Sequence, residues 1–297
     1  MTKIFLAGAT GMLGSKIAQD LRRHGALVRA LVRPETGRGD TARALASQGV
    51  EIVEGSVLDP VERLARAVED TEVVVSAVQG GDDVVTHGQV NLLRAAEQAG
   101  VPRMIPSDFA IDLFRLDYGD NVFLDHRKKA DEAFGGSPVQ ATSILAGAFL
   151  EVMTAPFIEM IDWDSRTFSY WGDGDQPCDF TTVADTAAYT AAVALDPGTA
   201  GRPVRVAGDV LTMKEFHAAM ERGSGHRLEL RNLGGVDDLA AEIQRRKGVS
   251  ASPAGYVALQ YVWAMVSGKA KLDPLDNARY PRIRPTAVAE FARQYAR

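Results

Sequence analysis

Three glycines near the start of the chain have the spacing of a phosphate-binding turn. Gly8, Gly11 and Gly14 follow the short apolar run 3–7 and precede a segment whose apolar residues recur at helical spacing. Gly8 lets the chain leave a strand in a tight turn, Gly11 lets backbone N–H groups approach a pyrophosphate, and Gly14 lets a helix pack closely on the strand. The helix start adds unpaired N–H groups and a partial positive charge. Strand, turn and helix together predict a dinucleotide-binding site rather than an ordinary tight turn.

Two arginines behind the next strand indicate which dinucleotide is bound. NAD-binding proteins of this type place an acidic residue about 20 residues after the glycines, where it binds the ribose 2′-hydroxyl. Here the strand 26–32 is followed by Arg33, and Arg38 stands in the loop beyond it. A guanidinium matches a 2′-phosphate with two hydrogen bonds. Unless both are merely solvated loop arginines, this pattern predicts NADP(H) rather than NAD(H).

Composition is that of an ordinary globular enzyme. The 297 residues are 46% hydrophobic and 24% charged, with a net charge of −6 and both signs mixed along the chain. No basic stretch indicates a nucleic acid or an anionic membrane as partner. Cys178 is the only cysteine, so an intrachain disulfide is excluded and a reducing compartment is expected. Met1 leads directly into the first strand, and the apolar stretch 253–266 is too short for a membrane span. We therefore expect a cytoplasmic protein.

Strand-like and helical patterns alternate along about the first 150 residues, which predicts an α/β fold with a Rossmann-type doubly wound parallel sheet. We expect this NAD(P)-binding domain over 1–155 and a smaller, mostly helical substrate domain over 156–297, with 180–207 packing back onto the first domain. The expected strands are 3–7, 26–32, 51–55, 71–78, 103–107, 140–149 and 202–207. The expected helices lie near 41–47, 59–62, 82–99, 125–134 and 185–195.

Four segments resemble a known family. They are GATGMLG at 8–14, VPRMIPSDF at 101–109, TSILAGAFLE at 142–151 and DFTTVADTA at 179–187. Together they resemble the NmrA-like and isoflavone-reductase-like branch of the atypical short-chain dehydrogenases, and the similarity covers nearly the whole chain. Ala110 replaces the glycine that usually ends the second motif. The resemblance implies a Rossmann fold and a nicotinamide cofactor, but it specifies an activity only poorly.

The dinucleotide contacts follow from the glycine turn, the strand ends and the resemblance. Ser76, Ala77 and Val78 end the fourth strand, where the backbone is expected to line the adenosine ribose. The resemblance adds residues of the second motif and of the strand that passes the nicotinamide. The full predicted set is Gly8, Thr10, Gly11, Met12, Leu13, Gly14, Arg33, Arg38, Ser76, Ala77, Val78, Ser107, Phe109, Gly147 and Phe149.

Catalytic residues are harder to identify. The usual Tyr-x-x-x-Lys pair of short-chain dehydrogenases is absent. The resemblance implies instead one lysine at the start of the helix after the fifth strand, where this chain has Arg127, Lys128 and Lys129. A guanidinium does not give up its proton, whereas Lys128 or Lys129 would do so if desolvated. His126 is a second candidate, as a proton relay. The alternative is a solvated basic helix start.

Two functions remain open. The first is an NADPH-dependent reductase of a small, aromatic or conjugated carbonyl-type substrate, and the aromatic, apolar segment 256–265 favours it. The second is a dinucleotide-sensing regulator that acts on a protein partner without turnover, and the missing tyrosine favours it. The acidic turn 173–175 lacks the further ligands of a calcium loop, so we expect no metal site.

Overall fold

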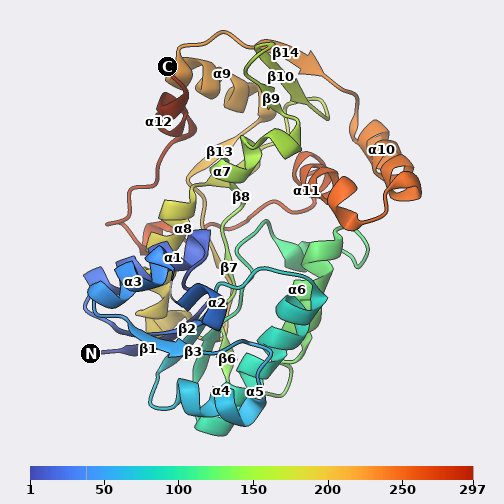
Figure 1. The fold of residues 1–297 in the computed structure, drawn as a ribbon. Coiled ribbons are helices and arrows are strands. Elements are labelled where there is room, and N and C mark those ends of the chain that lie inside the picture. Colours follow the sequence, from blue (N-terminus) through green and yellow to red (C-terminus); the bar gives the residue numbers. More distant parts are fainter. Residues whose placement is uncertain (38, 297) are drawn as a thin grey trace. The chain divides into compact units, whose positions relative to one another are not determined.

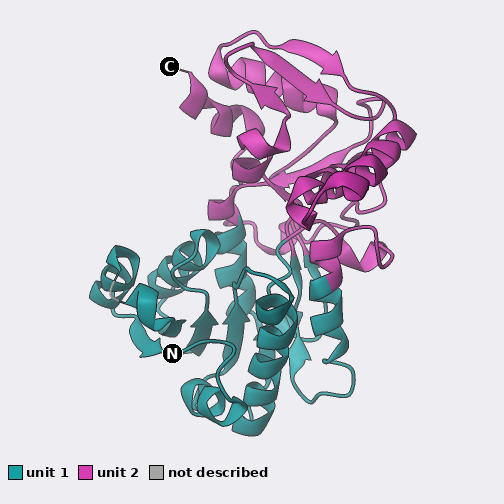
Figure 2. Cartoon of the chain, turned by 45° about the vertical axis from the view of Figure 1, so that its right-hand side comes forward, with its two compact units in different colours: residues 1–109, 126–144, 186–204 teal, residues 110–125, 145–185, 205–297 magenta. Residues whose placement is uncertain are grey.

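The computed structural model describes residues 1–37 and 39–296 and divides into two compact units (Figure 2). Unit 1 comprises 1–109, 126–144 and 186–204, and unit 2 comprises 110–125, 145–185 and 205–297. This division differs from the single boundary predicted after residue 155, because the chain leaves unit 1 before the end of its sheet and later returns. Within the predicted segment 180–207, residues 186–204 belong to unit 1.

Unit 1 contains a six-stranded sheet in the order β3-β2-β1-β4-β5-β6 (Figure 1). Its strands are β1 (Lys3–Ala7), β2 (Leu27–Val32), β3 (Glu51–Glu54), β4 (Val73–Ser76), β5 (Arg103–Ile105) and β6 (Gln140–Ala141). All neighbouring strands pair in parallel. The direction of winding reverses between β1 and β4, which is the Rossmann arrangement and confirms the predicted doubly wound fold.

Helices cover both faces of this sheet because its strands are apolar on both sides. Ile4 and Leu6 of β1 are as fully buried as Phe5 and Ala7, whose side chains point the other way. Phe5 and Ala7 pack in one hydrophobic core together with buried side chains of the helices α4 and α5. The helices are α1 (Met12–Arg23), α2 (Pro34–Gly37), α3 (Asp40–Ser47), α4 (Val61–Val68), the π-helix η1 (Asp83–Gly88), α5 (Gln89–Ala99), α6 (Val122–Glu132) and α8 (Val183–Ala194).

The strand predicted over 140–149 is broken into three short pieces. Beyond β6 these are β7 (Ile144–Leu145), which pairs with β12 (Val204–Arg205), and β8 (Ala148–Phe149). Gly147 separates β7 from β8 with a φ of +68°, and a Cβ there would lie 2.4 Å from the carbonyl oxygen of Asp179. The left-handed backbone at this glycine ends the extended run that the residue pattern indicated.

Unit 2 combines two small three-stranded sheets with helices. The first sheet contains β8, β11 (Cys178–Thr181) and β13 (Asp209–Leu211), and the second contains β9 (Ile161–Asp162), β10 (Thr167–Tyr170) and β14 (Glu229–Asn232). The helices are α7 (Leu150–Met153), α9 (Met213–Ser224), α10 (Val236–Val249), α11 (Val257–Val266) and α12 (Val288–Phe291). Short 3₁₀ turns are η2 (Leu113–Arg115), η3 (Pro156–Ile158), η4 (Pro197–Thr199, in unit 1), η5 (Pro253–Gly255), η6 (Asn277–Arg279) and η7 (Ala292–Tyr295). Phe168, Phe180 and Phe216 are fully buried and anchor the core.

Across residues 1–37 and 39–296, every helix falls short of the length and apolar content that crossing a membrane requires.

Gly14 provides a test of how closely α1 packs on the turn before it. A Cβ at Gly14 would lie 2.1 Å from the carbonyl oxygen of Gly8, so Gly14→Ala should lower the free energy of unfolding by about 1–3 kcal/mol or more. The matched control is Gly248→Ala in α10, where an added Cβ meets nothing within 4 Å and should stabilise the helix by up to about 1 kcal/mol. Urea unfolding measures both. Equal midpoints for the two variants would contradict this packing.

Candidate functional site

The site begins where β1 and β4 end side by side. Gly8 follows β1 with a φ of +81°, and a Cβ there would lie 2.4 Å from the carbonyl oxygen of Ala77 and 3.0 Å from the amide nitrogen of Val78. The Ala77 amide donates to the carbonyl oxygen of Ala7 at 2.9 Å. Backbone therefore packs on backbone at the point where the strand order reverses, which is where open α/β sheets bind ligands.

The amino terminus of α1 opens at this point. Gly11 is its N-cap, with ordinary extended angles (φ −76°, ψ 171°), and its amide donates to the Gly8 carbonyl oxygen at 3.0 Å. No side chain caps the helix and no acidic residue stands in its first turn, so its first N–H groups are left for an anion. A Cβ at Gly11 would meet only the Gly8 carbonyl oxygen, at 3.3 Å. Met12 is exposed and Leu13 is buried.

Two serines lie at the adjoining strand ends. Ser76 is fully buried, and its hydroxyl has no hydrogen-bond partner among residues 1–37 and 39–296. Ser107 donates its hydroxyl proton to the carbonyl oxygen of Val78 at 2.8 Å, and its amide donates to Oε1 of Gln89 at 2.6 Å. Ser107 therefore holds the segment that follows β4, and the buried Gln89 holds the Ser107 backbone. Ser107 was predicted from the sequence, whereas Gln89 was not. The glycine turn, the uncapped helix and the unpaired Ser76 hydroxyl fit a dinucleotide.

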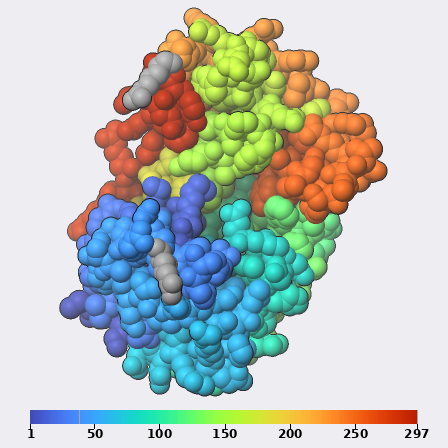
Figure 3. Space-filling view, in the orientation of Figure 1, coloured from blue at the N-terminus to red at the C-terminus, as the bar shows by residue number. Residues whose placement is uncertain are grey.

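Arg33 stands directly after β2, at the edge of the sheet where β1 and β4 also end. Its side chain is 64% exposed and its only described ion pair is with the equally exposed Glu35, at 3.4 Å. Such a surface pair contributes at most about 1 kcal/mol, so it does not compete strongly with a phosphate. The short α2 turn that follows has no buried residue and lies at the surface (blue in Figure 3). Arg38, the second predicted arginine, lies outside the described residues.

The start of α6 is tied to the loop after β4. Nδ1 of His126 lies 2.8 Å from Oδ1 of Asp82. The Thr86 hydroxyl lies 2.6 Å from the same carboxylate oxygen and 3.0 Å from the carbonyl oxygen of His126. The Thr86 hydrogen bond, with His126 and His87 nearby, lowers the pKa of Asp82. The π-helix carries Thr86 and His87, and π-turns are frequent at functional sites. His126 is therefore positioned by Asp82 rather than free to rotate.

The basic residues of α6 differ in their surroundings. The guanidinium of Arg127 has its Nε and Nη1 atoms buried, beside the carboxyl groups of Asp108 and Asp131. Lys128 is half-buried and Lys129 is exposed. Of the three candidates, Arg127 differs from the lysines because part of its guanidinium is shielded from solvent. The role of Lys128 as proton donor stays a prediction.

Two predicted contacts belong to unit 2. Gly147 approaches the backbone of Asp179 closely, as described above, and Phe149 ends β8 opposite Thr181 of β11. Phe109, by contrast, is buried at the end of a unit 1 segment. The dinucleotide contacts of Gly147 and Phe149 stay predictions.

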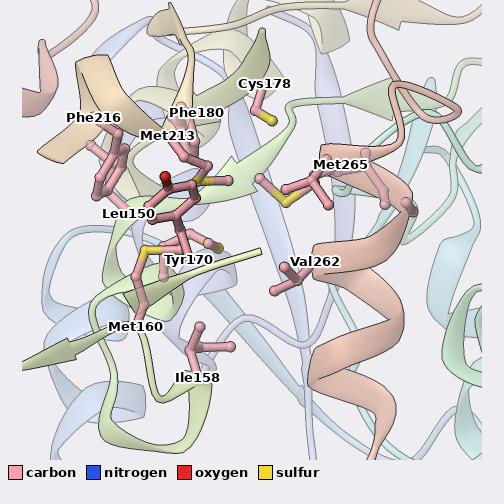
Figure 4. Close-up of a cluster of buried hydrophobic side chains, with 14 of the residues drawn as sticks. Leu150, Ile158, Met160, Tyr170, Cys178, Phe180, Met213, Phe216, Val262 and Met265 are labelled. Carbon is pink, nitrogen blue, oxygen red and sulfur yellow. The ribbon is translucent and has the colours of Figure 1, made fainter. Parts of the chain in front are cut away.

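Unit 2 contains a small pocket of about 50 Å³, lined mostly by apolar residues but also by the ion pair of Glu159 and Arg246. Val262 projects from α11 toward Ile158, Met160 and Tyr170 on the facing segments (Figure 4). Trp171 completes the aromatic part of the lining. Ligand pockets are usually several hundred Å³, so this pocket is a gap in the core of unit 2 that is too small for an aromatic ring.

Comparisons with known proteins are consistent with this geometry. The model of the NmrA-like family matches residues 1–278. Pinoresinol reductase 1 of Arabidopsis thaliana is 26% identical over 311 residues, covering 99% of this chain and 97% of the relative. Isoflavone reductase of Pisum sativum is 26% identical over 322 residues, covering 99% and 98%. A crystal structure of isoflavone reductase, 24% identical, superposes with a TM-score of 0.85 over 99% of both chains. A leucoanthocyanidin reductase–NADPH complex from Vitis vinifera, 21% identical, gives 0.83 over 99% of both.

Gly11→Val tests the phosphate position. The backbone angles of Gly11 are open to any residue, and an added Cβ makes one tight contact, 3.3 Å from the Gly8 carbonyl oxygen, which a small shift relieves. The fold should therefore survive while the branched side chain occupies the space of the pyrophosphate. We expect dinucleotide binding to be lost, measured by cofactor fluorescence, with an unchanged circular dichroism spectrum. The control is Met12→Ala, which shortens an exposed neighbouring side chain and should bind normally. Intact binding in Gly11→Val would place the phosphates elsewhere.

Proposed function

The chain belongs to the NmrA-like family, and from this premise we propose that it is an NADPH-dependent reductase of a small, aromatic or conjugated carbonyl-type substrate. One observation carries the proposal: the glycine turn between β1 and α1 packs so closely that a Cβ on Gly8 would strike the backbone of Ala77, and a Cβ on Gly14 in the first turn of α1 would strike the backbone of Gly8. This packing leaves the uncapped amide groups at the start of α1 open to a phosphate. Relatives named as reductases supply the reaction type.

NADPH is proposed over NADH because of the residue that follows β2. The pyrophosphate of the cofactor would bind to the backbone amide groups at the start of α1. The 2′-phosphate would meet Arg33, whose guanidinium is exposed and only weakly paired. The unphosphorylated ribose of NADH would offer the Arg33 guanidinium no anionic group to bind.

The chemistry divides between the cofactor and the protein. When bound, NADPH supplies the hydride. This chain must then hold the acceptor and deliver a proton to it, and we assign that proton to Lys128 on α6. His126, fixed by Asp82 at 2.8 Å, is the neighbouring group that would relay a replacement proton.

The proposed substrate class rests on the relatives. Their names refer to pinoresinol and isoflavone, both of which are aromatic. These relatives do not favour the regulator alternative. Burial and the neighbouring Asp179 raise the pKa of the Cys178 thiol to about 12, so this thiol stays protonated near neutral pH and is a poor nucleophile. We also propose a reducing, cytoplasmic setting, in which a lone cysteine stays reduced.

Turnover is tested by following NADPH oxidation with a panel of acceptors: quinones, enones, aromatic aldehydes, an isoflavone and pinoresinol. Oxidation with an aromatic or conjugated member supports the proposal. If NADPH binds but no member of the panel is reduced, the result favours the alternative that the protein is a dinucleotide-sensing regulator. The next experiment would then test for protein partners.

Cofactor choice gives a quantitative prediction. NADPH should bind at least about tenfold more tightly than NADH, since a hydrogen bond to a charged group contributes about 1.5–3 kcal/mol and about 1.4 kcal/mol is tenfold. Arg33→Ala should remove most of this preference. Arg43→Ala, which removes an exposed arginine of α3 already paired with Asp40, should keep it. Fluorescence titration of both cofactors decides. Equal affinities in the unaltered protein would refute the assignment.

Lys128→Ala should reduce turnover at least about a hundredfold with little change in NADPH affinity, because general acid catalysis typically supplies about 10²–10⁴. Lys129→Ala is the matched control: it removes the same group one residue along the helix, about 100° away, where the side chain is exposed. Steady-state kinetics and cofactor titration separate the two effects. If Lys129→Ala is the damaging change, the helix register assigned here is wrong.

A further inference from the structure

Unit 2 has a hollow of about 390 Å³ that none of the described dinucleotide or catalytic candidates lines. Its walls come from three segments that are far apart in sequence: the turn between β9 and β10, the loop after α9, and η7. The lining residues are Trp163, Arg166, His226, Gln294 and Tyr295. Small-molecule sites in proteins have volumes of several hundred Å³, so this hollow is large enough for a ligand, unlike the gap beside α11.

The aromatic walls of the hollow are anchored by contacts within unit 2. The rings of Trp163 and Tyr295 stack with their centroids 4.7 Å apart and an angle of 22° between their planes. The His226 ring lies edge-on to Trp163, with the centroids 6.1 Å apart. The Tyr295 hydroxyl donates to Oγ1 of the buried Thr154 at 2.9 Å. An aromatic ligand therefore meets a surface that is already formed, which lowers the cost of binding.

Arg166 gives the hollow a permanent positive charge, and none of the described residues that line it is acidic. The Arg166 carbonyl oxygen accepts from the Glu229 amide at 2.7 Å. Asp162 fixes the same turn, because its Oδ1 accepts from the amides of Asp164 at 2.9 Å and Ser165 at 3.1 Å. The Arg166 guanidinium is exposed and has no ion pair or hydrogen bond within residues 1–37 and 39–296. The backbone of this turn is therefore held in place, and its charge is available to an anion.

We propose that this hollow is a binding site for a small aromatic carboxylate. The guanidinium of Arg166 binds the carboxylate through two parallel hydrogen bonds, and the ligand ring packs against the rings of Trp163 and Tyr295. Arg166 repels a cationic ligand, and an anion without a ring gains little from the aromatic walls. The site does not depend on the reductase function, because it uses no residue assigned to the dinucleotide or to catalysis.

Isothermal titration calorimetry on the whole protein, with and without NADPH, measures binding with naphthoate as the probe. Naphthamide has the same rings but no charge, so it should bind at least about tenfold more weakly than naphthoate. Cyclohexanecarboxylate has the charge but no aromatic ring, and it should also bind more weakly. The proposal is overturned if naphthoate shows no saturable binding up to about 1 mM, or if naphthoate and naphthamide bind with equal affinity.

Substitutions at Arg166 test whether the hollow is where naphthoate binds. The Arg166 backbone has a φ of +53°, which asparagine adopts readily, so Arg166→Asn removes the charge and keeps the turn. This variant should bind naphthoate at least about tenfold more weakly. Arg166→Lys should bind with intermediate affinity, because lysine keeps the charge but lacks the planar fork. The matched control is Arg231→Asn, an exposed position of β14 outside the hollow, which should bind normally. No loss in Arg166→Asn, or an equal loss in both asparagine variants, would refute the site.

NADPH affinity separates this site from the dinucleotide site. Arg166→Asn should bind NADPH as tightly as the unaltered protein does. Gly11→Val, in which we expect NADPH binding to be lost, should still bind naphthoate with unchanged affinity. If Gly11→Val loses naphthoate as well, naphthoate occupies the dinucleotide site and the proposal fails.

Discussion

The contact on which the rest of the site depends is between backbone and backbone. The turn after β1 passes so close to the end of β4 that no Cβ fits at Gly8, and α1 passes so close to the same turn that none fits at Gly14. These two approaches fix the direction in which α1 starts. The direction of α1 in turn determines where its unpaired amide groups point. The Ser107 side chain at a neighbouring strand end then hydrogen-bonds to a backbone whose position these contacts have fixed.

Two arginines of unit 1 differ in their burial and in their partners. Arg103, at the start of β5, is buried and points its guanidinium at the carbonyl oxygens of Val193 and Ala194 at the end of α8. The carboxyl end of a helix carries a partial negative charge, so neutral acceptors suffice. Arg127 is only partly buried, and its Nε and Nη1 atoms have no hydrogen-bond partner among the described residues.

The sequence was sufficient for the features that local chemistry determines. The glycine spacing, the apolar strands and Arg33 at a strand end all follow from short-range rules, and the sheet order bears out the predicted fold. The break at Gly147 was missed because it depends on Asp179, which is distant in sequence. Strands of two to four residues in unit 2 are too short to show alternation. The partial burial of Arg127 near Asp108 and Asp131 was not predicted, because charged residues are normally solvated.

The division of the chain into interleaved segments has a consequence for how such a protein changes over time. Each unit is assembled from three separate stretches of sequence, so neither can be exchanged as one continuous piece of a gene. A change confined to one unit must therefore arise by point replacement or by loop insertion within its three stretches, for unit 2 within 110–125, 145–185 or 205–297. Recombination with an unrelated domain, the route open to proteins built from consecutive modules, is closed to this architecture.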